Sequence, residues 1–105
     1  MTVKEFLEAT YEPETVFQVR GRVRCADGFS ISIQGGSQSH YCSPREKCNE
    51  YNSVELGFPS HGEPELMEYA EEPRKCRQTV YAYVPIAAIE AVIARHGGIK
   101  TWKGK

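Results

Sequence analysis

The sequence predicts an α+β domain: a mainly antiparallel, four-stranded sheet with an N-terminal and a C-terminal helix packed on one face. Apolar and polar residues alternate along 16–34, 53–58 and 79–84, as they do in half-buried strands. Near both ends of the chain the apolar residues instead recur at helical spacing. The length of 105 residues suits one core, and no internal repeat is present. We therefore assign residues 1–105 to a single domain, with a loose tail at about 100–105.

The clearest strand signal is a hairpin over Val16 to Gln34 with its turn at 26–28. A two-residue turn at Asp27 and Gly28 would place Arg24 on the same face as Ile31 and mix charge into the core. A three-residue loop with Gly28 in the left-handed conformation avoids this conflict. It predicts three cross-strand pairs: Cys25 with Phe29, Val23 with Ile31, and Gly21 with Ile33.

Two start signals predict helices in the first half of the chain. Thr2 and Glu5 have the spacing of a capping box, which predicts a short amphipathic helix over 3–10. Ser43-Pro44-Arg45-Glu46 offers an N-cap, a proline at the first helical position and a closing glutamate. This second signal predicts a short helix to about Tyr51.

The second half is predicted to alternate strands with helices. Residues 53–58 form the third strand and residues 79–84 the fourth, because apolar side chains alternate in both. A short helix is expected over 63–72 between them. Pro85 then opens the clearest helix of the chain, which Gly97 and the following glycine end.

The polar face of the hairpin is the first candidate binding surface. Arg20, Arg22 and Arg24 alternate along it, and Tyr81 and Tyr83 are expected on the same face of the sheet. Arginines interleaved with aromatic rings can hold phosphates and stack bases. The alternative is a solvated face on which Glu55 neutralises one arginine and the tyrosines pack beneath the others. With 13 Lys and Arg against 14 Asp and Glu, duplex binding is disfavoured, and single-stranded nucleic acid or an acidic protein patch fits better.

A second candidate surface is the acidic segment between the third and fourth strands. A glutamate-rich helix can mimic nucleic-acid phosphates towards a basic groove of a partner. A charge run can equally be a solvated helix face. The five glutamates of this segment are Glu63, Glu65, Glu68, Glu71 and Glu72.

The thiol and imidazole groups are candidate zinc ligands, although their spacing departs from that of structural zinc sites. Such sites use two close ligand pairs, and this chain offers one short pair followed by a five-residue gap. The candidates are Cys25, His40, Cys42, Cys48 and Cys76. The alternative is that they are ordinary buried thiols. Activation of Cys42 by His40 is disfavoured because alternate residues of an extended segment face opposite ways. We therefore assign no catalytic residue and no cofactor.

The N-terminal residues lack the apolar run of a secretory signal, and no stretch of the chain approaches membrane-spanning length. A cytoplasmic protein without membrane contact is therefore expected. Four cysteines in such a chain favour thiols or metal ligands over disulfides.

Two passages carry a resemblance: Val54-Glu55-Leu56-Gly57-Phe58-Pro59-Ser60, and Val80-Tyr81-Ala82-Tyr83-Val84-Pro85 with the helix after it, through His96-Gly97-Gly98-Ile99. They look like small proteins of prophages and integrative elements in Gram-positive gut bacteria. The resemblance implies an accessory or counter-defence factor, including anti-CRISPR proteins that occlude an RNA-guided nuclease. It carries over no catalytic residue.

The expected function is therefore non-enzymatic: a phage or mobile-element protein that inhibits a bacterial nucleic-acid-handling complex by binding to it. A small single-stranded nucleic-acid-binding module and a zinc-stabilised domain are the alternatives. A homodimer also remains open, because an apolar strand edge would favour one.

Overall fold

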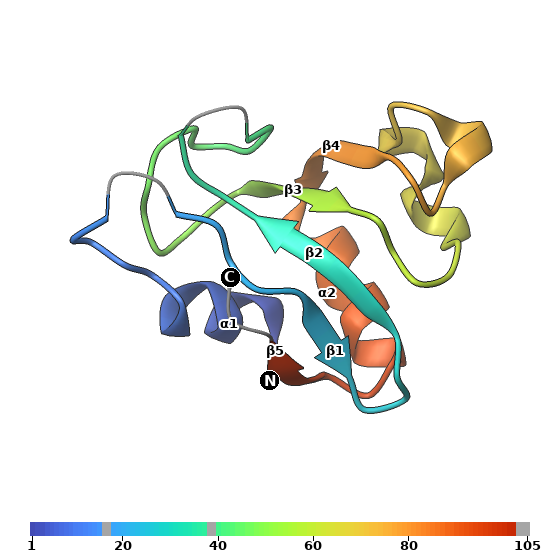
Figure 1. The fold of residues 1–105 in the computed structure, drawn as a ribbon, viewed down its shortest axis with the longest axis horizontal. Coiled ribbons are helices and arrows are strands. Elements are labelled where there is room, and N and C mark those ends of the chain that lie inside the picture. The colour runs from blue at the N-terminus through green and yellow to red at the C-terminus, as the bar shows by residue number, and fades with distance from the viewer. Residues whose placement is uncertain (16–17, 38–39, 103–105) are drawn as a thin grey trace.

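Five antiparallel strands form the sheet of this α+β domain, in the order β4-β3-β2-β1-β5 (Figure 1). The computed structural model describes residues 1–15, 18–37 and 40–102. The α+β class is confirmed, and the predicted number of strands is one too low. The elements are α1 (Val3–Ala9), β1 (Val23–Cys25), β2 (Ser30–Gln34), β3 (Ser53–Gly57), η1 (Pro64–Tyr69), η2 (Pro73–Lys75), β4 (Val80–Pro85), α2 (Ile86–Arg95) and β5 (Ile99–Trp102), where η denotes a 3-10 helix.

The β1–β2 hairpin has the predicted register. Val23 lies opposite Ile31, and the Cys25 N–H donates to the Phe29 carbonyl at 2.8 Å. Gly28 closes the turn with φ of 95°, a conformation that glycine adopts without a steric penalty. The strand is shorter than predicted because regular pairing begins only at Val23. The first residues of the predicted hairpin, 16–17, lie outside the described residues.

A bulge between β3 and β4 reverses the predicted orientation of one tyrosine. Val54 pairs with Val84 and Leu56 with Tyr81, so two residues of β4 lie opposite Glu55 alone. The extra residue brings Tyr81 inward, where it is fully buried, instead of outward as strict alternation predicts. The alternation of inward and outward side chains along β4 therefore shifts by one residue at the bulge.

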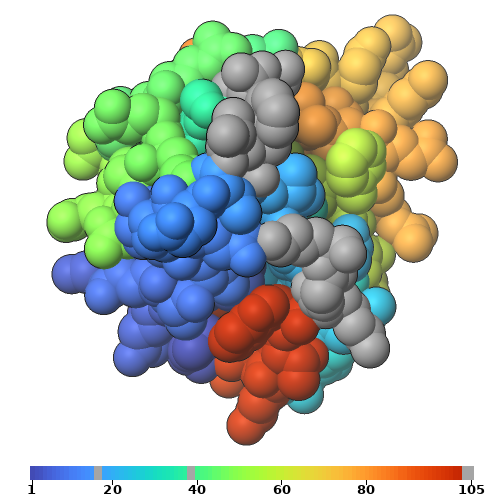
Figure 2. All heavy atoms as spheres, turned by 60° about the vertical axis from the view of Figure 1, so that its left-hand side comes forward, coloured from blue at the N-terminus to red at the C-terminus, as the bar shows by residue number. Residues whose placement is uncertain are grey.

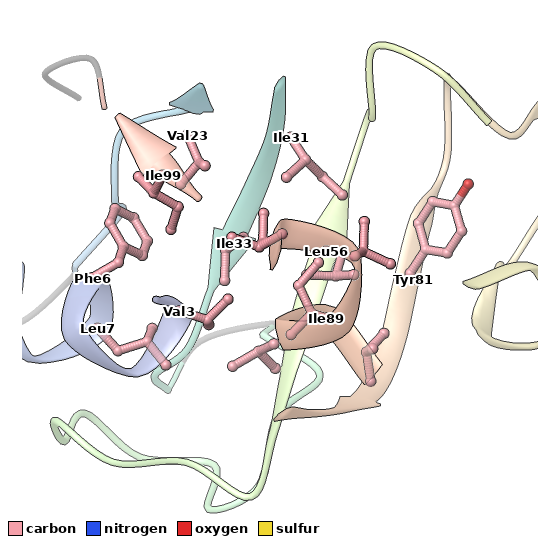
Figure 3. Packing of buried hydrophobic residues seen from close by; sticks show 14 of the residues in the cluster. Val3, Phe6, Leu7, Val23, Ile31, Ile33, Leu56, Tyr81, Ile89 and Ile99 are labelled. Atoms are coloured by element: carbon pink, nitrogen blue, oxygen red, sulfur yellow. The ribbon is translucent and has the colours of Figure 1, made fainter. Parts of the chain in front are cut away.

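The core lies between the sheet and the two α-helices, which both pack on one face (Figure 3). Glu90 of α2 joins the helices by accepting hydrogen bonds from the Val3 and Lys4 N–H groups at 2.8 and 3.1 Å. The predicted capping box at Thr2 and Glu5 is present. The main buried side chains are Val3, Phe6, Leu7, Val23, Phe29, Ile31, Ile33, Val54, Leu56, Leu66, Tyr81, Val84, Ile89, Val92, Ile93 and Ile99.

The helix predicted from Ser43 to Tyr51 is wrong. The Ser43 N–H donates instead to the Ser53 carbonyl at 3.1 Å, which ties the segment to the start of β3. The Tyr51 ring is buried beside Gly35, and its hydroxyl donates to the Glu46 carbonyl at 2.9 Å. Long-range pairing and burial of a large ring therefore outweigh the local start signal.

The predicted loose tail is also wrong as far as residue 102. Residues 99–102 form β5, and Trp102 lies opposite Val23. The Trp102 ring packs edge-on against Phe6 with ring centroids 5.6 Å apart. The Ile99 N–H donates to the Met1 carbonyl at 2.9 Å, so the two ends of the described chain adjoin (Figure 2). Pairing with β1, burial of Ile99 and the contact between Trp102 and Phe6 together hold the fifth strand.

The outer edge of β4 is covered by its own chain. Tyr81 forms an isolated bridge with Ala70, and the Val80 carbonyl accepts the Glu71 N–H at 3.0 Å. Further along, the Tyr83 N–H donates to the Tyr41 carbonyl at 3.0 Å. The helix predicted over 63–72 is the shorter η1, and the residues after it provide this cover.

Candidate functional site

The predicted surface of three arginines and two tyrosines does not form, because Arg20 points into the protein. Its side chain is only 4% exposed and donates to the Thr10 hydroxyl and the Gly35 carbonyl at 2.7 and 2.8 Å. Burial lowers the pKa of this guanidinium. The Gln34 side-chain amide satisfies the Arg20 backbone as a neighbouring strand would. Its oxygen accepts from the Arg20 N–H and its nitrogen donates to the Arg20 carbonyl, both at 2.8 Å. Arg20 is a structural residue.

The other two arginines of the predicted surface differ from each other. Arg22 lies over β2 and donates to the Ser30 hydroxyl at 3.0 Å and to the Phe58 carbonyl at 2.6 Å. Arg24 is exposed to solvent. Of the tyrosines, Tyr83 is half-exposed, whereas Tyr81 lies in the core. Arg22 is thus the arginine of this set that links the sheet to the loop after β3.

The candidate zinc ligands also do not come together. Among residues 1–15, 18–37 and 40–102, no three His, Cys, Asp or Glu side chains are grouped as a metal site. All four cysteines are free. Burial raises the pKa of the Cys25 thiol to about 11, and burial likewise raises that of Cys42. His40 and Cys48 are half-buried, and Cys76 lies at the edge of a surface hollow described below.

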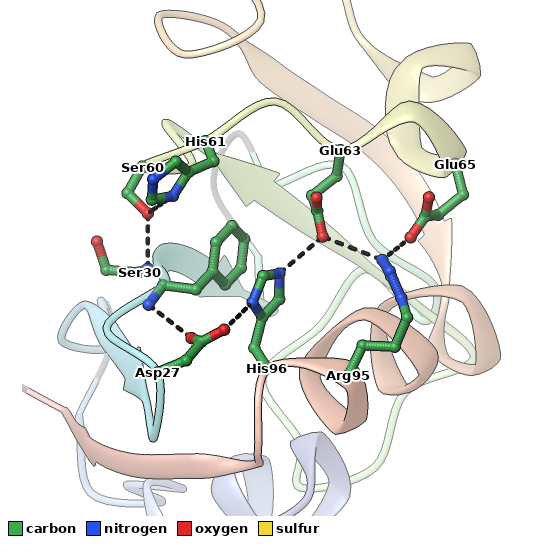
Figure 4. Close-up of polar contacts among 9 residues, drawn as sticks. Asp27, Ser30, Ser60, His61, Glu63, Glu65, Arg95 and His96 are labelled. Atoms are coloured by element: carbon green, nitrogen blue, oxygen red, sulfur yellow. Dashed lines mark hydrogen bonds and ion pairs between the residues drawn. The ribbon is translucent and has the colours of Figure 1, made fainter.

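A polar bridge centred on His96 joins the hairpin turn to the acidic segment (Figure 4). His96 Nδ1 lies 2.6 Å from Asp27 Oδ2, and Nε2 lies 2.8 Å from Glu63 Oε1. The imidazole stacks on Phe29 with ring centroids 4.1 Å apart. A ring with a carboxylate at each nitrogen donates to both only when it is protonated. The bridge therefore favours the imidazolium form.

The pKa values of the bridge follow from this geometry. Burial alone would lower the pKa of His96, but hydrogen bonds to Asp27 and Glu63 outweigh it, so the net shift is upward. The hydrogen bond from His96 is the main cause of the lowered pKa of Asp27. The two groups stabilise each other's charged forms.

The acidic segment divides into a paired part and an unpaired part. Glu63 is buried, and its Oε1 forms an ion pair with Arg95 Nη2 at 3.1 Å. Glu65 pairs with the same guanidinium. Glu68, Glu71 and Glu72 are exposed, and within the described chain none of them forms an ion pair. They lie in the gold and orange segment that projects beyond β3 and β4 (Figures 1 and 2).

A basic hollow that the sequence analysis missed lies beside this segment. It has a volume of about 700 Å³ and is bounded by Arg22, by the loop after β3, and by η2 with the turn that follows it. Its lining residues are Arg22, Phe58, Pro59, Ser60, Arg74, Lys75, Cys76, Arg77 and Gln78, a set without a carboxylate. The run Pro73-Arg-Lys-Cys-Arg77 is the sequence signal that could have located it.

Phe58 lies in this hollow in an unusual backbone conformation. Its φ of 52° is in the left-handed region, which large side chains rarely adopt, and 48% of the residue is exposed. Its N–H donates to the Thr79 carbonyl at 3.1 Å, and its carbonyl accepts from Arg22. These two hydrogen bonds fix the backbone and direct an aromatic side chain outward among cations.

Ser60 and His61 form the nearest approach to a catalytic pair. Ser60 Oγ lies 3.1 Å from His61 Nδ1 and also accepts the Ser30 N–H at 3.0 Å. Hydrolytic serines are activated by a histidine that a third group orients. Within the described ranges no carboxylate is bonded to the exposed His61 ring. We assign no catalytic role to this pair.

Comparison of the chain with protein-family models, with curated proteins and with solved structures finds no match. The class that the structure defines is a small α+β domain with a five-stranded antiparallel sheet. In the described parts of the chain, no helix has both the length and the apolar character of a membrane span.

Proposed function

We propose that this protein acts by binding, without catalysis, and that its partner is a nucleic-acid-handling complex of a bacterial cell. The proposed activity is inhibition of that complex. The resemblance to mobile-element proteins makes an RNA-guided nuclease the first complex to test, which corresponds to an anti-CRISPR type of function. A cytoplasmic site of action follows from such a partner.

The observation that carries the proposal is the unpaired part of the acidic segment. Glu68, Glu71 and Glu72 are exposed and have no ion pair with any residue that the structure describes, whereas Glu63 and Glu65 just before them are paired. Carboxylates spaced along a rigid segment present negative charge as a nucleic-acid backbone does, and basic grooves of nucleic-acid enzymes complement it. The paired residues hold the segment in place for this contact.

The test is a binding and inhibition assay with purified RNA-guided nuclease complexes. The variant Glu68→Lys/Glu71→Lys/Glu72→Lys should weaken binding by about tenfold or more, because each attraction to a basic groove becomes a repulsion. The matched control is Glu8→Lys/Glu14→Lys/Glu46→Lys, which makes the same change in net charge at exposed glutamates elsewhere.

The control should bind as the natural chain does. If both triple variants retain full binding and inhibition, the acidic segment is not the contact surface. If the natural chain neither binds nor inhibits any complex tested, this class of partner is wrong.

A further inference from the structure

We propose that the basic hollow around Phe58 is a binding site for single-stranded nucleic acid, in which one base stacks on the Phe58 ring and the flanking phosphates contact the surrounding cations. The lining of this site does not include Glu68, Glu71 or Glu72, on which the proposed inhibition depends. The inference goes beyond that inhibition and can hold or fail independently.

The charge of the hollow is the first argument. Arg74, Lys75 and Arg77 are exposed around it, and in the described chain none of them forms an ion pair with a carboxylate. Arg22 adds a fourth cation, held by its bonds to Ser30 and Phe58. Four cations around a concavity without an acidic lining residue concentrate anions there, even though the whole chain carries a net charge of -1.

The backbone around the cations is fixed, which favours a defined site over a diffuse patch. The Lys75 N–H donates to the Glu72 carbonyl at 2.8 Å, and the Gln78 N–H donates to the Lys75 carbonyl at 2.7 Å. The hydroxyl of the buried Tyr81 donates a hydrogen bond to the Cys76 carbonyl at 2.5 Å. The backbone of the basic turn is therefore anchored to β4, so the three cations leave the chain at fixed points around the hollow.

Phe58 is the second, independent argument. An exposed phenyl ring loses favourable burial, and its left-handed backbone adds a steric cost, so the position would suit glycine better on grounds of stability. A ring held outward among cations is the arrangement that binds bases by stacking while arginine and lysine hold the phosphates.

The same ring selects the form of the nucleic acid. Stacking on Phe58 requires the face of a base, which a paired and stacked duplex does not expose. An acidic peptide would satisfy the cations but would leave the ring without a stacking partner. Single-stranded nucleic acid satisfies both features.

Fluorescence anisotropy with a labelled single-stranded oligonucleotide tests the proposal, with oligothymidylate and oligouridylate as probes. We expect binding at low salt, with a slope of log K against log salt of about −3 if four cations contact phosphates. A hairpin duplex of the same length should bind more weakly. Polyglutamate, an anion without bases, should compete poorly.

Phe58→Gly isolates the role of the ring, because glycine adopts the left-handed backbone and the variant should fold. Binding should weaken about tenfold, and Phe58→Trp should restore it. The matched control is Tyr83→Gly, which removes the other half-exposed aromatic residue with φ of 52°, outside the lining of the hollow. This control should bind as the natural chain does.

Arg74→Gln/Arg77→Gln should reduce the salt slope by about half, because two of the four phosphate contacts are lost. The exposed pair Arg45→Gln/Lys100→Gln, outside the hollow, should leave it unchanged. Absence of binding at low salt would overturn the proposal. Equal effects of Phe58→Gly and Tyr83→Gly, or equal competition by polyglutamate, would also overturn it.

Discussion

The His96 bridge and the charged segment 68–77 are close in the fold but use their charges in opposite ways. In the bridge, Asp27 and Glu63 contact both nitrogens of one imidazole, and Arg95 completes the network. Along 68–77, carboxylates and cations follow each other without ion pairs within the described chain. The difference separates charges that hold the fold from charges that remain available to a partner.

The largest loss of stability is expected at Arg20, a charged residue that holds the fold from a buried position. Arg20→Met should lower the free energy of unfolding by about 3 kcal/mol, because buried carbonyl and hydroxyl groups lose a charged donor. Arg24→Met, at an exposed position of the same predicted surface, is the control and should change little. Urea unfolding of both variants is the measurement, and equal losses would contradict the assignment of Arg20 as structural.

A smaller effect is expected at His96, where the stabilisation depends on pH. His96→Gln should lower the free energy of unfolding by about 1 kcal/mol at pH 6, since glutamine loses the charge that both carboxylates contact. His61→Gln is the control, because His61 is exposed and touches neither carboxylate. Thermal unfolding of the two variants at pH 6 distinguishes them.

The direction of the pH dependence follows from the shifts in pKa. The raised pKa of His96 means that its contribution is full below the ordinary histidine value of about 6.5 and is lost as pH rises through the folded value. The lowered pKa of Asp27 means that its contribution is present above the ordinary aspartate value of about 3.9 and is lost at lower pH. The bridge should thus stabilise most between about pH 4 and 6.5. A His96→Gln variant with an unchanged pH profile would refute this origin.

The smallest effect on stability is expected in the charged segment. Glu68→Lys/Glu71→Lys/Glu72→Lys should change the free energy of unfolding by less than about 0.5 kcal/mol for each substitution, since these exposed side chains have no ion pair with a described residue to lose. Urea unfolding at pH 7 checks this. A large loss in the free energy of unfolding would show that the three glutamates stabilise the fold, contrary to this expectation.

Local patterns predicted the parts of the fold in which local and long-range preferences agree. The capping box at Thr2, the three-residue loop at Gly28 and the stop at Gly97 all follow from residue chemistry at the position itself. The helix predicted to begin at Ser43 does not form because the Ser43 backbone forms an antiparallel bridge with Ser53. Strand β5 was missed because it depends on pairing with the distant β1, on burial of Ile99 and on the contact of Trp102 with Phe6, none of which a local pattern records.

The candidate sites were predicted less well for a related reason. Alternation assumes a regular strand, but Arg20 lies before regular pairing begins and Tyr81 lies next to a bulge. The five glutamates of the acidic segment were predicted as one set, whereas the structure divides them into a paired and an unpaired part in the described chain. This division depends on Arg95 and His96, about thirty residues further along the chain. The basic hollow required the loop at Phe58 and the turn at 74–77 to meet in space.

The covered edge of β4 limits how a partner can recognise this end of the molecule. Because the Val80 carbonyl and the Tyr83 N–H already have partners in Glu71 and Tyr41, an incoming strand would have to displace them before it could extend the sheet. A partner that binds at this edge therefore contacts side chains rather than the backbone of β4. Such a surface can change its specificity one residue at a time while the sheet beneath it stays the same.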